Sequence, residues 1–146
     1  MALVSKENII DYIPQKPPIV MIDAIINCEE TYVTTQFEIN KENIFVKDSV
    51  LLEPGIIENM AQTAAAKAGY EAKRQNAEPF LGFIGAIKDL KIYAFPKVGN
   101  MLKTTVTVKM DVMGITLIWA ASMCKDMKIA ECEMKILIRK TTDVPA

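Results

Sequence analysis

The sequence of 146 residues contains no histidine. This absence excludes Ser-His-Asp triads, Cys-His pairs and histidine-bound metal sites from any activity of the chain alone. The groups that remain for chemistry are carboxylates, lysines, tyrosines, hydroxyls, thiols and the dipoles of the backbone. Any reaction that needs an imidazole therefore requires a second chain.

The sequence also lacks a charge excess, a metal-binding cysteine pattern and a long apolar run. A net charge of −1 gives no general attraction for nucleic acid or an anionic membrane. The three cysteines, Cys28, Cys124 and Cys132, lie in apolar stretches without metal-type spacing, which favours free thiols in a reducing compartment. No run approaches the roughly 18 apolar residues of a membrane helix, and the first ten residues do not resemble a secretory signal. We therefore expect a cytoplasmic protein with no metal, no cofactor, no nucleic-acid partner and no membrane span.

The composition, 51% hydrophobic and 24% charged, is that of a globular protein, and we expect one domain over residues 1–146. A capping signal at Ser5 predicts a short helix. The apolar, β-rich run over residues 19–26 predicts a strand, and alternation over residues 31–40 predicts a second, half-buried strand.

Strand character resumes over residues 80–96, and the chain then alternates through an antiparallel meander of three strands with one apolar face. We expect the tail, residues 141–146, to be frayed. The predicted inward residues of the three strands are, in order, Val106, Val108, Met110 and Val112; Ile115, Leu117, Trp119, Ala121 and Met123; and Ala130, Cys132, Met134, Ile136 and Ile138.

Between these groups of strands, residues 54–72 predict one helix, with Pro54 suited to its first turn. At 1.5 Å per residue it would be about 28 Å long, enough to cross a small domain. Helical spacing places mostly small side chains on one face, which would let a sheet approach the helix closely. The residues of this stripe are Ile57, Ala61, Ala64, Ala65 and Ala68, with Ile56 and Met60 beside them.

Glu58 and Gln62 lie one turn apart on this helix, beside the apolar stripe. One interpretation is that Glu58 is solvated and stabilised by the positive end of the helix dipole. The other is that Glu58 lies in an apolar cleft, where partial desolvation would raise its pKa and suit it to acid–base chemistry.

Three segments, "IPQKPPIVMIDAI", "GIIENMAQTAA" and "GFIGAIKDLKIYAFPKVGN", occur in the order and spacing of the β-hydroxyacyl-acyl carrier protein dehydratases of the FabZ/FabA type. The chain resembles this family over most of its length, and the "E-x-M-A-Q" part of the helix is the most specific match. It is similar in particular to divergent dehydratase-like proteins of aryl-polyene pigment pathways. The resemblance implies an α+β hotdog fold, in which a curved antiparallel sheet wraps a long helix and subunits pair to extend the sheet.

In that family each site combines a helix carboxylate with a histidine from the facing subunit. The resemblance assigns the carboxylate to Glu58 and a substrate-binding role to Gln62. It matches Gly55 with the residue whose backbone N–H helps to bind the thioester carbonyl. We expect Gly85, in "GFIGA", to be a place where backbone approaches the substrate. Neither family histidine is present, since Gln15 replaces one and "IFVKDSVLLEPG" replaces the loop of the other.

Three hypotheses follow for the function. The first is a dehydratase-like subunit that binds an acyl thioester on acyl carrier protein or coenzyme A, weakly active alone or completed by a histidine-bearing paralogue in a heterodimer. The second is a hotdog thioesterase that uses Glu58 as base or nucleophile. The third is a non-catalytic acyl-binding or scaffold subunit. A homodimer is the alternative assembly, because hotdog subunits seldom leave the pairing edge of the sheet bare.

Overall fold

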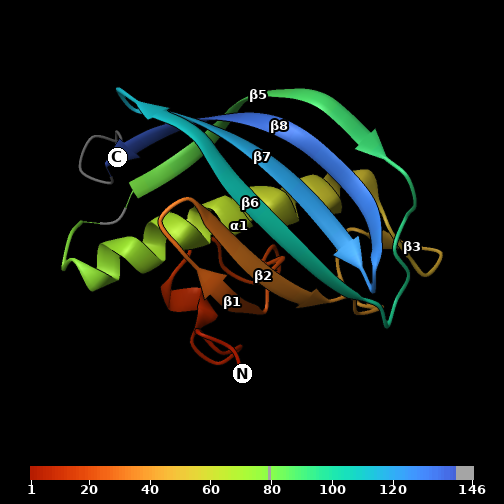
Figure 1. Ribbon diagram of the computed structural model, residues 1–146. Helices are drawn as coiled ribbons and strands as arrows, with labels where there is room; N and C mark the ends of the chain where they lie inside the picture. The colour runs from red at the N-terminus through yellow and green to blue at the C-terminus, as the bar shows by residue number, and fades with distance from the viewer. Residues whose placement is uncertain (79, 141–146) are drawn as a thin grey trace.

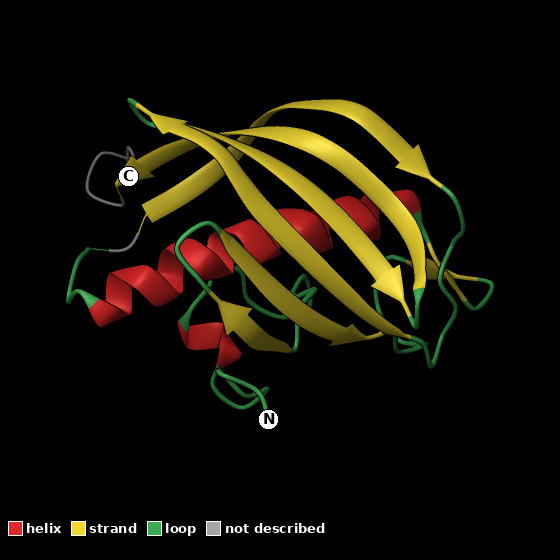
Figure 2. Cartoon of the chain, in the orientation of Figure 1, coloured by secondary structure: helices red, strands yellow, loops and turns green. Residues whose placement is uncertain are grey.

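The computed structural model describes residues 1–78 and 80–140, and the predicted tail lies outside them. One long helix, α1 (Glu53–Arg74), lies along the concave side of a six-stranded antiparallel sheet (Figures 1 and 2). The strands follow the order β1-β2-β6-β7-β8-β5 across the sheet, so β5 forms one edge. Their bounds are Ala24–Cys28 for β1, Tyr32–Glu38 for β2, Phe80–Ile92 for β5, Met101–Val112 for β6, Ile115–Cys124 for β7 and Met127–Lys140 for β8.

Smaller elements complete the ends of this layer. A single 3-10 turn, η1 (Ile9–Asp11), replaces the short helix predicted from Ser5. A tight two-stranded ribbon, β3 (Val46–Lys47) and β4 (Val50–Leu51), leads into the start of α1. No helix among the described residues combines the length and apolarity needed to cross a membrane.

The helix begins and ends close to the predicted residues, with Pro54 in its first turn and Lys73 and Arg74 in its last, where cations complement the dipole. Its most deeply buried face differs from the predicted stripe. Ile56, Met60 and Thr63 are fully buried beneath the sheet, whereas the alanines of the predicted stripe are only partly buried.

In the sheet, the predicted inward face of β8 is confirmed, with Cys132 and Met134 fully buried. The predicted inward face of β7 is wrong. Ile118 and Ala120 point into the core, because they pair with Val108 and Val106 of β6. A β-bulge between Val108 and Met110 then turns the end of β6 over. As a result Met110 and Val112 are exposed instead of buried.

The predicted strand over residues 19–26 is also wrong in its first half, because β1 begins only at Ala24. The backbone of residues 19–21 is instead hydrogen-bonded to side chains of α1. Met21 N–H donates to Gln62 Oε1 over 2.6 Å, and Asn59 Nδ2 donates to Met21 O over 2.8 Å. This segment therefore belongs to the surroundings of the helix carboxylate and not to the sheet.

Candidate active site

Glu58 lies in the second turn of α1, half-buried, and its side chain is fixed by its neighbour one turn later. Gln62 Nε2 donates to Glu58 Oε1 over 2.8 Å. Gln62 itself is fully buried. Glu58 is therefore a positioned carboxylate and not a freely solvated one.

The partners of Gln62 determine which end of its amide faces Glu58. Its Oε1 accepts from the backbone N–H of Met21, which can only donate, and its Nε2 donates to the carbonyl of Ile19 over 2.7 Å, which can only accept. The remaining N–H therefore points at Glu58. Because this hydrogen bond needs an acceptor on Glu58, it matches a carboxylate at that position.

Replacing Gln62 by Leu should destabilise the protein by about 2 kcal/mol, because the buried N–H of Met21 and the carbonyl of Ile19 lose their partner. The measurement is the free energy of unfolding in urea. Gln36→Leu is the matched control, since Gln36 lies on β2 and is only partly buried. Equal effects of the two substitutions would contradict the role given to Gln62.

A second buried side chain of α1, Asn59, was not singled out from the sequence. Besides its bond to Met21, its Oδ1 accepts from Thr104 Oγ1 over 2.6 Å, and Thr104 and Ser122 share a hydrogen bond of 2.7 Å. All of these side chains are fully buried. Asn59 thus connects the segment beside Glu58 to the middle of the sheet. A polar residue on the same face as Ile56 and Met60 was the signal that could have identified it.

The two glycines assigned to substrate binding have packing explanations in the structure. The N–H of Gly55 donates to the carbonyl of Leu52 over 3.0 Å. A Cβ at Gly55 would lie 2.6 Å from Leu51 Cδ1 and 2.7 Å from Phe45 Cβ. Gly85 is the extra residue of a bulge in the edge strand β5, where its pairing with β8 shifts register. Their contact with substrate remains a prediction.

The surroundings of the three cysteines and of Asp23 suit structural roles. All three cysteines are free, and burial raises the pKa of the Cys132 thiol to about 11, which makes it unreactive at neutral pH. Burial also raises the pKa of Asp23, against the opposing effect of the Glu38 N–H that donates to Asp23 Oδ2 over 2.8 Å. Asp23 therefore ties the start of β1 to the end of β2.

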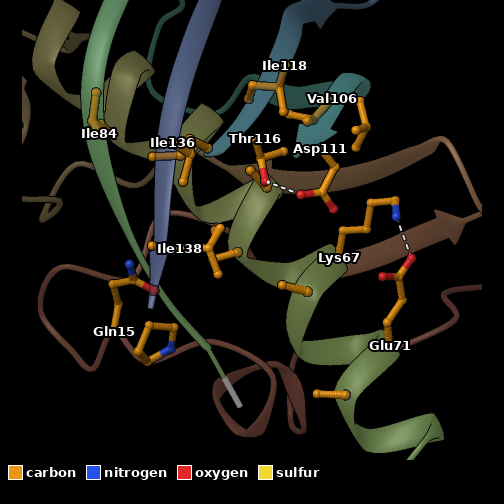
Figure 3. A pocket seen from close by; sticks show the side chains of 18 of the residues that line it. Gln15, Lys67, Glu71, Ile84, Val106, Asp111, Thr116, Ile118, Ile136 and Ile138 are labelled. Carbon is orange, nitrogen blue, oxygen red and sulfur yellow. Dashed lines mark hydrogen bonds and ion pairs between the residues drawn. The ribbon is translucent and has the colours of Figure 1, made fainter. Parts of the chain in front are cut away.

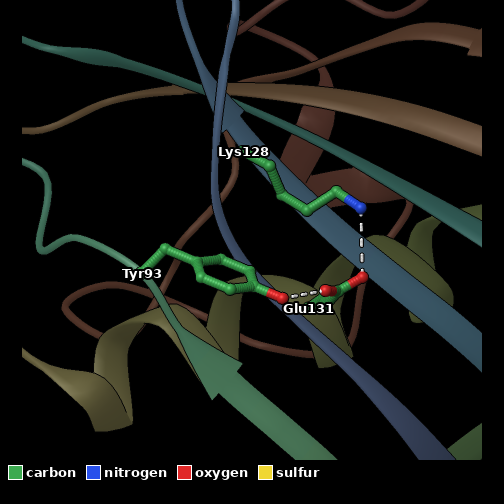
Figure 4. Close-up of polar contacts among 3 residues, drawn as sticks. All are labelled: Tyr93, Lys128 and Glu131. Carbon is green, nitrogen blue, oxygen red and sulfur yellow. Dashed lines mark hydrogen bonds and ion pairs between the residues drawn. The ribbon is translucent and has the colours of Figure 1, made fainter.

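A polar cluster lies where β5 ends beside β8. Tyr93 donates a hydrogen bond to Glu131, and Lys128 Nζ lies 3.1 Å from Glu131 Oε1 (Figure 4). Tyr93 and then Lys128 lower the pKa of Glu131, and the same hydrogen bond raises the pKa of Tyr93. Tyr93 and Lys128 are exposed, so the cluster is at the surface.

Replacing Tyr93 by Phe should raise the pKa of Glu131, because the larger of its two stabilising hydrogen bonds is lost. Any stability that the lowered pKa contributes is present above the pKa of an unfolded glutamate and is lost as pH falls through the folded value. The check is an NMR titration of the Glu131 carboxyl carbon, beside Lys128→Gln. An unchanged pKa of Glu131 in the Tyr93 variant would contradict this role of the Tyr93 hydroxyl.

Comparison with known proteins identifies the family. A profile of the ApeP-like family, described as ApeP dehydratase, matches residues 7–143. A search of curated protein sequences finds no significant match.

Among solved structures, the dehydratase heterocomplex ApeI:P from Xenorhabdus doucetiae superposes with a TM-score of 0.86 at 16% identity, over 92% of this chain and 93% of that one. The virulence protein Cj0977 of Campylobacter jejuni gives 0.65 at 15% identity, over 86% and 81%. The protein smu.793 of Streptococcus mutans UA159, bound to acetyl CoA, gives 0.63 at 9% identity, over 80% and 87%. These likenesses confirm the α+β hotdog fold. By the match over nearly its whole length, the chain belongs to the ApeP-like dehydratase family.

Proposed function

We propose that this chain is one half of a dehydratase: a hotdog subunit that binds a β-hydroxyacyl thioester, supplies Glu58, and depends on a partner subunit for histidine. The observation that carries the proposal is a carboxylate fixed by Gln62 in a chain without histidine. Dehydration needs a base for the α-proton and an acid for the leaving hydroxyl, and each contributes typically 10²–10⁴-fold. Glu58 is the only member of such a pair that we assign to this chain.

The part of the chain that replaces the family's histidine loop supports this proposal. It forms the β3–β4 ribbon, and its Phe45 and Leu51 lie against Gly55 at the start of α1. The ribbon carries hydroxyl, carboxylate and amine groups but no imidazole. The assembly of ApeP with ApeI in one solved complex supports a heteromeric partner, and the acetyl CoA bound to another hotdog neighbour supports a thioester substrate.

The test is a mass-spectrometric assay with a β-hydroxyacyl thioester on acyl carrier protein. The chain is assayed alone and after co-expression with a histidine-bearing hotdog subunit from the same organism. Loss of water only in the mixture, and only when the partner keeps its histidine, is the expected result. Loss of water by this chain alone would overturn the proposal.

Two other outcomes identify the competing functions. Release of the acyl group as a free acid by the chain alone would indicate a thioesterase, a function represented among the hotdog neighbours by a hypothetical thioesterase from Streptococcus pneumoniae TIGR4 with coenzyme A. If the partner subunit eliminates water equally fast with and without this chain, the chain is a scaffold, and the assignment of Glu58 is overturned.

A further inference from the structure

A cavity of about 210 Å³ lies between the C-terminal half of α1 and the inner face of the sheet (Figure 3). The helix lines it with small side chains and the sheet with branched ones. Neither Glu58 nor Gln62 is among the described residues that line it. The principal wall residues are Ala61, Ala64, Ala68, Ile84, Ile118 and Ile136.

The shape of the cavity follows from the two surfaces that form it. The alanines of the predicted stripe are only partly buried and line the cavity, whereas Ile56 and Met60 are fully buried beneath the sheet. An apolar cavity of about 150 Å³ is known to stay dry and to bind small apolar molecules. The volume here exceeds that, yet it is below the roughly 300 Å³ at which drug-sized sites begin. It suits an alkyl chain of moderate length or a single ring.

One end of the cavity holds an acceptor without a donor. The Oε1 atom of Gln15 is buried, and none of the described residues donates a hydrogen bond to it. Gln15 lines the cavity and lies across it from Lys67 (Figure 3). A buried acceptor without a partner is costly, so a ligand that brings an N–H or O–H to this end gains a hydrogen bond.

The opposite end is polar and carries a net negative charge. The side chain of Lys67 is only 10% exposed and forms an ion pair with Glu71, and Thr116 donates to Asp111 over 3.2 Å. Lys67 is positive and Glu71 and Asp111 are negative, so the net charge at this end is −1. The Lys67 ammonium is already paired, and the net negative charge repels a carboxylate or sulfonate head group. A neutral ligand is therefore favoured over an anionic one.

We infer that this cavity is a second binding site, distinct from Glu58, for a neutral, mainly alkyl molecule or group that carries a hydrogen-bond donor. The apolar walls bind the alkyl part of the ligand, and Gln15 Oε1 accepts a hydrogen bond from the ligand's donor. The pairs Lys67–Glu71 and Asp111–Thr116 exclude anions. The cavity lies within one chain, so binding does not require the partner or the thioester reaction. A failure to bind a ligand in this cavity can therefore be distinguished from a failure of the proposed dehydration.

The experiment is isothermal titration calorimetry of the full chain with octan-1-ol, its isomer 1-methoxyheptane, and octanoate at neutral pH. The alcohol and the ether have the same atoms, but only the alcohol can donate to Gln15. We expect saturable binding of octan-1-ol, about five- to tenfold weaker binding of the ether and at least tenfold weaker binding of octanoate. Absence of saturable binding, or equal affinities for the two isomers, would overturn the inference.

Two variants locate the site. Ala64→Leu keeps a good helix former but fills the cavity, and should weaken octan-1-ol binding at least tenfold. Ala121→Leu, the same change on the outer face of β7, should leave binding unaltered. Gln15→Met, of similar size without the acceptor, should make the alcohol and the ether bind equally, which tests the site even where Ala64→Leu folds poorly. Equal binding by the two leucine variants would place the ligand elsewhere.

Discussion

Substituting Glu58 by Gln should lower the rate of water elimination by the assembled complex by about 10²–10⁴-fold. The substitution removes a proton-transfer group but retains an oxygen that can accept the hydrogen bond from Gln62 Nε2. The segment at Ile19 and Met21 keeps its own bonds to Gln62. The loss of rate should therefore occur without loss of stability.

The readout is the initial rate of water loss from the β-hydroxyacyl thioester, measured with the histidine-bearing partner present. Glu53→Gln is the matched control, because Glu53 is an exposed carboxylate in the first turn of the same helix. The control should leave the rate within about twofold, and the thermal unfolding of both variants should match the parent. An unchanged rate with Glu58→Gln would mean that this carboxylate does not transfer protons.

The sequence was sufficient to predict this carboxylate but not its surroundings. Glu58 and Gln62 are four residues apart on an evident helix, so their contact is a local property. The groups that fix the Gln62 amide are backbone atoms of residues 19 and 21, which are 43 and 41 residues away in the chain. An apolar run at that position is equally compatible with a strand. Only the folded chain shows that its polar backbone groups bond to a helix.

The same limit explains the errors in the sheet. β7 carries apolar residues on both faces, with Ile118 inward and Leu117 outward, so alternation alone could not identify its buried side. In β8, charged residues such as Glu133 and Lys135 alternate with apolar ones, and the prediction was right. The bulge in β6 has no local signal in its run of alternating residues.

The α+β class was predictable because it depends on the order and length of whole elements and not on single residues. A helix of 22 residues is followed by long runs of strand, and the segments shared with the FabZ/FabA type specify the order of elements. The packing of the helix was not predictable from its small residues. They suggested close contact with the sheet, but Ile56 and Met60 provide more apolar surface to bury. Ala64 is left partly buried and lines the cavity.

Replacing Gly69 by Ala should destabilise the protein by about 3 kcal/mol, although alanine is the better helix former by about 1 kcal/mol. A Cβ on Gly69 would lie 1.8 Å from the carbonyl oxygen of Tyr12, far inside contact distance. That carbonyl belongs to the backbone, so relief requires movement of the segment and not rotation of a side chain. Lys73 holds the same segment in place, with its ammonium 5.1 Å from the centre of the Tyr12 ring.

The cost arises because this segment contributes to the core. Ile9 and Ile13, on either side of Tyr12, are buried, and the ring of Tyr12 stacks on Tyr70 with centroids 6.1 Å apart. Moving the backbone away from α1 would disturb these contacts together, as overpacking does elsewhere. The measurement is the free energy of unfolding in urea, followed by far-UV circular dichroism.

Gly99→Ala is the control for the same chemical change. Gly99 has a φ of +91°, and a Cβ added there would have no other atom within 4 Å, so only backbone strain of about 1 kcal/mol is expected. If helix propensity decided the outcome at Gly69, the alanine variant would be more stable than the parent by about 1 kcal/mol. The two explanations therefore predict changes of opposite sign in the free energy of unfolding. A stabilised variant would show that Tyr12 does not lie against α1, and a strongly destabilised one that this contact fixes the N-terminal segment on the helix.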